Sequence, residues 1–231
     1  MPRNNRVAPG GMVFHVLNRG NGRMRIFGKE GDYPAFEKVM RETLKMIPVR
    51  LLGYCLMPNH WHLVLWPRGD GELGRFMQRL TITHVRRWHE HRKTVGGGHV
   101  YQGIYKSFPV QNDEHLLAVM RYVESNALRA RMVRRAEKWT WSSLGARLMG
   151  RREAVEMLSE WPVERPGDWV EMVNEVPEKE VEEVRMSVVK GRPFGGEIWQ
   201  KRVGGRLGLE STFRGRGRPR MKEKGVEEGK E

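Results

Sequence analysis

The sequence has only one cysteine, Cys55, among its 231 residues. A single thiol cannot form an intramolecular disulfide, and it excludes a zinc site built from several cysteines. Because Cys55 lies in the apolar run of residues 51–57, we expect it to be a buried structural thiol. Cysteine chemistry therefore has no part in the function that we predict.

The chain also lacks an apolar stretch long enough to cross a bilayer and the apolar core of a signal peptide. We therefore expect a cytoplasmic protein without a membrane partner. A P-loop sequence is absent as well, so the sequence does not indicate a reaction that consumes ATP.

Acidic residues are scarce in the first part of the chain. The whole sequence has 42 Lys and Arg against 28 Asp and Glu, a formal charge of +14. Residues 151–231 hold 17 basic and 17 acidic side chains, which leaves 25 basic and 11 acidic in residues 1–150. The excess of positive charge thus lies in the part expected to form the main domain. Such an excess indicates a polyanionic partner, since Lys and Arg neutralise phosphates, although general basicity for solubility is an alternative.

Hydrophobic periodicity predicts alternating strands and helices, with a hairpin turn at residues 58–59. A further helix, capped by Asp113, should follow the last strand. The order βαββαβ followed by a helix predicts an α+β fold of the ferredoxin-like or RRM-like type. In this fold two helices cover one face of an antiparallel sheet, and we expect the other face to be available for a ligand. The predicted strands are residues 12–18, 50–57, 60–66 and 106–111, and the predicted helices are residues 33–47 and 73–91.

The pattern weakens after about residue 150. We therefore divide the chain into a main domain, residues 1–150, and a C-terminal extension, residues 151–231. The extension is expected to be partly helical, with a helix at residues 197–209. Its Gly- and Arg-rich end, residues 214–220, has a composition typical of disorder.

His60 and His62 are the first candidates for chemistry. Alternate residues of a strand point to the same face, so the two histidines should project together, with their Cβ atoms roughly 6–7 Å apart. Two imidazoles at this spacing can bind one cation. The intervening Trp61 should point the other way, towards the helices. A His-x-His pair alone is a weak signal, and two ordinary hairpin histidines are the alternative.

Tyr122 and Asn126 are the second pair of candidates. They are spaced i and i+4 on a stripe beside the apolar face of the last helix, so a phenol and an amide oxygen can reach the same place. Asn126 would complete a site of two nitrogens and one oxygen, which suits Mn²⁺ or Mg²⁺ when water and phosphate supply the remaining ligands. The alternative is a half-buried tyrosine whose hydroxyl faces water.

Four ordered blocks of sequence together resemble the single-tyrosine HUH transposases, in particular the REP-associated tyrosine transposases. The resemblance spans about residues 5–145, and the segments RPFG and GRPR near the C-terminus also resemble the tails of that group. The blocks are HVLNRGN at residues 15–21, MPNHWHLV at residues 57–64, YQG at residues 101–103 and RYVESNALRA at residues 121–130.

The resemblance implies a metal-dependent enzyme that cuts and rejoins single-stranded DNA, commonly beside a hairpin. His60 and His62 would bind the metal, Asn126 would assist them, and Tyr122 would be the nucleophile, forming a 5′-phosphotyrosine. The sequence departs from the family where Ala127 replaces a frequent proline and Arg131 a frequent glycine. Both changes favour a longer helix after Tyr122.

DNA contacts are predicted from arginines that lie near aromatic residues, which suit unpaired bases and phosphates. His115 is a candidate to accept the proton of Tyr122, because the usual tyrosine pKa is near 10. The partner is expected to be single-stranded or hairpin DNA, and the protein a monomer or homodimer, in the nucleoid when DNA is bound. The predicted DNA-binding residues are Asn18, Arg19, Arg23, Arg25, Arg75, Arg79, Arg86, Arg87 and Arg129.

Two other functions fit parts of the sequence. A non-catalytic RRM-like nucleic-acid binder would explain the basicity and the fold. It would, however, carry aromatic residues on the open face of the sheet, where this chain has His60 and His62. A zinc hydrolase built on the His-x-His pair would need a further Asp, Glu or His at a ligand spacing, and none is obvious.

Overall fold

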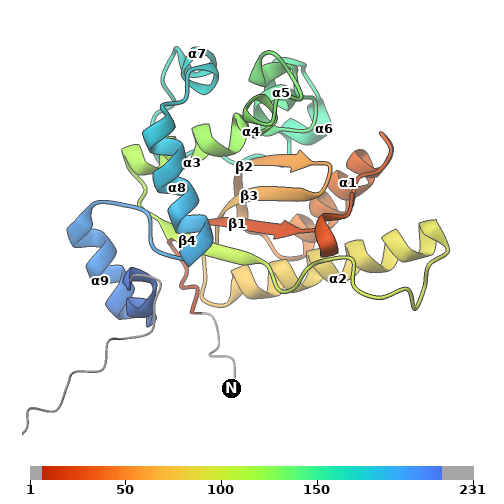
Figure 1. Ribbon diagram of the computed structural model, residues 1–231, viewed down its shortest axis with the longest axis horizontal. Coiled ribbons are helices and arrows are strands. Elements are labelled where there is room, and N and C mark those ends of the chain that lie inside the picture. The colour runs from red at the N-terminus through yellow and green to blue at the C-terminus, as the bar shows by residue number, and fades with distance from the viewer. Residues whose placement is uncertain (1–6, 215–231) are drawn as a thin grey trace, which may run out of the picture.

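The computed structural model describes residues 7–214, and its centre is a four-stranded antiparallel sheet (Figure 1). The strand order is β2-β3-β1-β4, which is the ferredoxin-like order predicted from the sequence. All three pairings are antiparallel, and β2 and β3 form the predicted hairpin. The strands are β1 (Val13–Arg19), β2 (Arg50–Met57), β3 (His60–Trp66) and β4 (Lys106–Val110).

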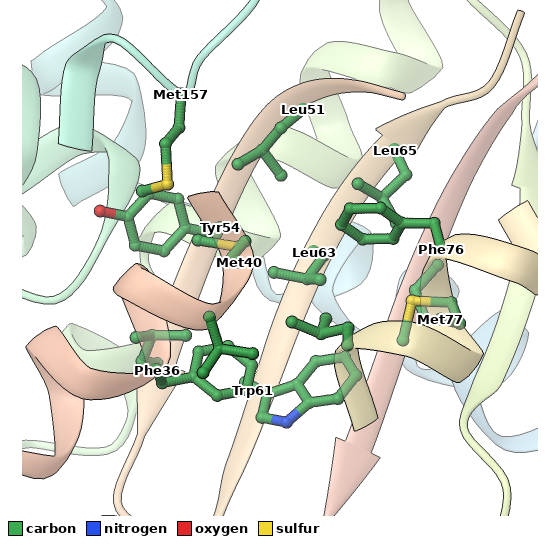
Figure 2. Close-up of a cluster of buried hydrophobic side chains, with 14 of the residues drawn as sticks. Phe36, Met40, Leu51, Tyr54, Trp61, Leu63, Leu65, Phe76, Met77 and Met157 are labelled. Atoms are coloured by element: carbon green, nitrogen blue, oxygen red, sulfur yellow. The ribbon is translucent and has the colours of Figure 1, made fainter. Parts of the chain in front are cut away.

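The first face of the sheet packs against α1 (Asp32–Met46) and α2 (Glu72–Arg92). Figure 2 shows Trp61 and Leu63 of β3 among side chains of these helices, including Phe36 and Phe76. All four side chains are fully buried. This face is a continuous apolar core, and the odd-numbered residues of β3 point into it as predicted.

The second face is also covered, which corrects the expectation that it would be open. The helices α3 (Glu114–Glu124) and α8 (Glu178–Lys190) lie over it, and α8 also contacts β4 (Figure 1). Buried residues of these helices join Leu52, Val64 and Phe108 of the sheet in a second core. The aromatic platform of an open RRM-like sheet is therefore not formed.

Gly53 allows α3 to approach the sheet closely. A Cβ atom at this position would overlap the side chain of Met120 on α3 and would lie 3.0 Å from Ser143 Oγ. The pairing of β2 with β3 is irregular between Leu51 and Gly53, which changes the faces to which β2 residues point. A larger residue at position 53 would force the Met120 side chain to move from its place between α3 and the sheet.

The described part of the C-terminal extension, residues 151–214, packs onto the same body as the residues before it. Trp169 and Val173 of α7 (Trp169–Asn174) are buried in the second core, while Ala154 and Met157 belong to the first. The packing is continuous across residue 150 in the described part of the chain. The division into a main domain and an extension therefore stays a prediction. The remaining elements are η1 (Asn21–Arg23), α4 (Asn126–Arg129), η2 (Ala136–Lys138), α5 (Ser143–Leu148), α6 (Arg152–Val155), α9 (Glu197–Leu207) and η3 (Glu210–Phe213).

The helix predicted near residues 197–209 is confirmed as α9, which ends at the left-handed Gly208. The Gly- and Arg-rich end lies outside the described residues after Arg214. Within residues 7–214, every helix is too short or too polar to span a bilayer. Cys55 is fully buried, as predicted, and burial raises the pKa of its thiol to about 12.

Candidate active site

His60 and His62 lie side by side at the start of β3, on the second face of the sheet. Their ring centroids are 5.1 Å apart. His60 Nδ1 is 2.6 Å from Asn59 Oδ1, and His62 Nδ1 is 2.8 Å from His15 Nε2. Both rings therefore use Nδ1 within the protein, and among residues 7–214 no hydrogen-bond partner takes up Nε2, which is left for a ligand.

His15 is a member of the site that the sequence analysis did not identify. It lies on β1, which pairs with β3 so that Leu17 is opposite His62. His15 is fully buried between His62 and Phe108, with ring centroids 5.0 Å and 4.8 Å away. The sequence signal was a histidine in the predicted first strand, whereas its register with the His-x-His strand is decided only by the fold.

The environment favours neutral imidazoles. Burial, followed by the charges of Arg19 and Arg129, lowers the pKa of His60 to about 4. Burial also lowers the pKa of His15 to about 3 and that of His62 well below its usual value. A neutral imidazole is the form that binds a metal ion, so near pH 7 these histidines do not need to lose a proton first.

Tyr122 lies on α3 with its ring against the same histidines. Its ring centroid is 5.8 Å from that of His62 and 6.3 Å from that of His15, in edge-on geometry. The side chain is 6% exposed. The structure thus brings the phenol and the histidine pair together, although they are about 60 residues apart in the sequence.

A buried carboxylate, Glu124, anchors the end of α3 two residues after the tyrosine. It accepts hydrogen bonds from Ser143 Oγ, from Arg147 Nη1 at 2.9 Å and from Trp169 Nε1 at 2.7 Å. Ser143 in turn accepts a hydrogen bond from the backbone N–H of Tyr54 on β2. Glu124 therefore ties the tyrosine helix to the sheet, to α5 and to the C-terminal extension.

The helix after Tyr122 is interrupted, so the expectation of one longer helix is wrong. Ser125 separates α3 from α4, and the helical segment ends at Arg129. Arg131 adopts the left-handed conformation, with φ 56°. An arginine thus tolerates the backbone conformation that favours glycine, and the change of residue type does not extend the helix.

Arg129 reaches back across this interruption. Its Nη2 donates to the backbone carbonyl of Tyr122 at 2.8 Å, and its Nε donates to Ser125 Oγ at 3.0 Å. The guanidinium carbon lies 4.1 Å from the centre of the Tyr122 ring. Arg129 therefore orients the tyrosine and places a positive charge beside it.

Asn126 begins α4 and is buried. The next residue, Ala127, contacts the thiol of Cys55 through its backbone, and Cys55 is the cross-strand partner of His62. This packing places α4 over the strand next to the histidines. Asn126 as a metal ligand stays a prediction supported by that position.

The arginines predicted to bind DNA fall into separate groups. Arg19 is the cross-strand partner of His60 and shares its face of the sheet. Arg23 and Arg25 are exposed in the connection between β1 and α1. The Asn18 side chain points to the first face, and its Nδ2 donates a hydrogen bond to the Gly103 carbonyl at 3.4 Å.

The four arginines of α2 lie behind the sheet, away from His60 and His62. Arg86 pairs with Glu90 at 2.9 Å, and Arg87 pairs with Glu42 at 2.7 Å. Trp88, which was expected beside unpaired bases, is partly buried and donates to the Ile26 carbonyl. The other two arginines, Arg75 and Arg79, are exposed.

His115 is the second residue of α3 and is not brought to the tyrosine. Tyr122 comes seven positions later, about 10 Å along the helix axis. Its Nδ1 lies 2.8 Å from Asp113 Oδ1, and its ring packs against Phe194. The structure gives no support to His115 as the direct proton acceptor.

Asp113, Glu114 and His115 form the one group of three His, Cys, Asp or Glu residues, within 7–214, whose donor atoms all lie within 4.8 Å of one another. Asp113 already caps α3 through the His115 N–H. Capping of the helix explains why these three side chains lie close together. The cluster lies apart from the histidine pair.

Comparison with known proteins supplies an independent view of the chain. A family model described as "Transposase IS200 like" matches residues 10–126, which include both histidines and Tyr122. No curated protein sequence matches the chain. A solved structure of a REP-associated tyrosine transposase bound to a REP hairpin is similar, with a TM-score of 0.52 and 14% identity. The similarity covers 72% of this chain and 95% of that chain.

A second solved structure, a candidate transposase from Deinococcus radiodurans, is similar with a TM-score of 0.39 and 19% identity. It covers 53% of this chain and 96% of that one.

Proposed function

The chain belongs to the IS200-like transposase family, and on that premise we propose that it cuts and rejoins single-stranded DNA through Tyr122. The observation that carries the proposal is the juxtaposition of the Tyr122 ring with His62, 5.8 Å away, beside His60. The similar structure was solved with a REP hairpin, and we expect a DNA hairpin with unpaired flanks to be the substrate here too.

The donor set suits a divalent metal such as Mg²⁺ or Mn²⁺. In the described part of the chain, His60 and His62 each keep Nε2 without a hydrogen-bond partner, burial favours their neutral form, and Asn126 would add an amide oxygen. Two imidazoles favour Mn²⁺, whereas phosphate and water oxygens suit either ion. The bound metal would withdraw charge from the scissile phosphate and orient its oxygens.

The protein residues would perform the transfer itself. The Tyr122 oxygen attacks phosphorus as the phenol releases its proton to solvent, and a new P–O bond forms. The bond between phosphorus and the 3′ oxygen breaks, and that oxygen leaves as a 3′-OH after taking a proton. Arg129 and Arg19 would hold the negative charge of the phosphate near the phenol.

The reverse reaction explains how strands are rejoined without ATP. The phosphotyrosine is a phosphodiester like the bond that it replaces, so the energy of the broken bond is retained. A second 3′-OH can attack it and release the Tyr122 phenol. The protein thus needs only to hold the 5′ end until another strand end arrives.

The direct test is the formation of a covalent adduct. Hairpin oligonucleotides from the DNA flanking the gene, labelled at the 5′ or 3′ end, would be incubated with Mn²⁺ or Mg²⁺ and the full chain. We expect a protein adduct on the 5′ end of the cut, and its loss in Tyr122→Phe. If the chain binds these DNAs but never cuts them with either metal, it is instead a non-catalytic DNA-binding member of the family.

A further inference from the structure

The helix α8 of the C-terminal extension lies over the second face of the sheet, next to the tyrosine helix α3 (Figure 1). Arg121, the neighbour of Tyr122, donates from Nε to Glu180 Oε1 at 2.8 Å and from Nη2 to Glu180 Oε2. The two side chains of this ion pair are only 15% and 17% exposed. Val181 and Val184 are buried in the second core. These contacts fix both the position and the rotation of α8 beside the candidate active site.

The fixed rotation of α8 decides where Arg185 projects. Val188 and Val189 line a cavity of about 320 Å³ between α8 and the sheet. Arg185 precedes them by three and four residues, so it lies one turn away on the same side of the helix. Its side chain is exposed. Arg185 is therefore available to a ligand that enters along this side of α8.

The opposite wall of this cavity is basic and begins beside the proposed metal site. It includes Arg19 of β1 and Lys106 of β4. Arg19 is the cross-strand partner of His60, and Lys106 is the cross-strand partner of Leu17. The cavity is thus a cleft that leads from the histidines along α8, with positive side chains on the sheet and Arg185 on the helix.

Arg185 and Arg129 are like charges held near each other. Burial lowers the pKa of the Arg129 guanidinium, Tyr122 raises it, and the charge of Arg185 lowers it. Within residues 7–214, neither these two arginines nor Arg19 forms an ion pair with a carboxylate. Neighbouring cations without a carboxylate repel each other, and an anion between them removes that cost. The arrangement therefore favours a phosphate at this place.

We propose that Arg185 binds a backbone phosphate of the DNA strand that enters the active site, so that α8 completes the substrate-binding site. The proposal rests on the proposed function. A guanidinium can donate two parallel hydrogen bonds to one phosphate, which makes arginine well suited to this contact. The match to the family model ends at residue 126, so the contact comes from a part of the chain beyond it. The unit needed for the reaction then extends past residue 150 and includes α8.

The test measures binding without cleavage. The full chain carrying Tyr122→Phe would be titrated with a hairpin that has unpaired flanks, in which single flanking phosphates are replaced by neutral methylphosphonates. Several replacements should weaken binding. Adding Arg185→Gln should weaken binding of the unmodified hairpin about tenfold, the loss expected for a hydrogen bond to a charged group. It should also abolish the methylphosphonate penalty at one position, because the two changes remove the same contact.

Arg185→Lys should restore part of the affinity, since the charge remains and the paired hydrogen bonds are lost. Lys179→Gln is the matched control, because it removes an exposed cation of the same helix that lines the cavity next to His115 instead. It should leave every methylphosphonate penalty unchanged.

Two results would overturn the proposal. One is an Arg185→Gln protein that keeps the penalty at every position, and the other is a Lys179→Gln protein that loses the same penalty. Urea unfolding of both variants would confirm that they fold as the parent does. Adduct formation by the Tyr122 protein is scored separately, so its absence would refute the proposed cleavage and not the phosphate contact.

Discussion

The two faces of the sheet differ in what they bury. The first face is covered by α1 and α2 and holds an apolar core that includes Trp61, Phe36 and Phe76. The second face buries His15 and His62 against Tyr122 and keeps the carboxylate of Glu124 fully buried beneath α3.

The difference follows from how each face is stabilised. Burial of apolar area stabilises the first face, and its buried polar groups, His84 and Glu37 among them, are hydrogen-bonded to Tyr101 and Tyr54 of the same core. On the second face, buried polar groups cost free energy unless they are hydrogen-bonded, so each must have a fixed partner. Those obligatory partners also hold His62 and Tyr122 in position.

The largest expected effect is on DNA cleavage, which should depend on the histidines of the second face. His60→Ala or His62→Ala should abolish DNA cleavage while leaving hairpin binding, because the basic surface remains. Cleavage of labelled hairpin and Mn²⁺ binding by titration calorimetry would be measured together. His91→Ala, an exposed histidine at the end of α2, is the matched control and should cut normally. Full cleavage by both mutants would refute the metal assignment.

Removing the anchor of α3 should have the next largest effect. Glu124→Ala would leave Arg147 without its partner in a buried network, and we expect a loss of about 3–5 kcal/mol in the free energy of unfolding. Phe76→Ala on the first face should cost a similar amount, about 3–5 kcal/mol. Denaturant unfolding would measure both.

The two variants should differ in activity when both are folded. Only Glu124→Ala should slow adduct formation at Tyr122, because only that variant loosens the tyrosine helix. Equal adduct rates in the two proteins would show that Glu124 acts on stability alone.

A smaller effect is expected from His15, which contacts His62 but does not reach the solvent. Partners that orient a metal-binding histidine typically contribute about 10–100-fold to metal affinity. His15→Ala should therefore weaken Mn²⁺ binding by about that factor without removing either proposed ligand. Electron paramagnetic resonance of free Mn²⁺ would measure the affinity directly. An unchanged affinity would mean that His15 serves only to fill the core.

The smallest expected effect is on how the stability of the protein depends on pH. It concerns Asp32 of α1, on the first face. Burial alone would raise the pKa of Asp32, but the backbone N–H groups of Lys29 and Gly28 and the Arg92 guanidinium outweigh it and lower the pKa. A lowered folded-state pKa stabilises the protein above the usual value of 3.8 and loses this contribution as the pH falls below it. Asp32→Asn should flatten the decline in stability below about pH 4, measured by urea unfolding. An unchanged slope would show that other carboxylates control acid unfolding.

Local patterns predicted much of the architecture. The strands and helices up to α3 were located within a few residues, because each has a clear periodicity and recognisable turns or caps. The Asp113 cap is confirmed. The break at Ser125 was missed, because periodicity does not report local contacts such as the hydrogen bond from Arg129 to the Tyr122 carbonyl across it.

The sequence by itself determined which side of β3 carries each residue. Side chains alternate along a strand, so His60 and His62 had to face away from Trp61 in any sheet that contains β3. Composition likewise placed the positive charge in the first 150 residues.

Only the tertiary structure decided which residues meet. The contact of His15 with His62 depends on the register between β1 and β3, and the burial of Glu124 depends on Trp169, 45 residues later. The position of the α2 arginines behind the sheet depends on which face α2 covers. These are non-local choices, made by the free energy of packing the whole chain, and no short stretch of sequence contains them.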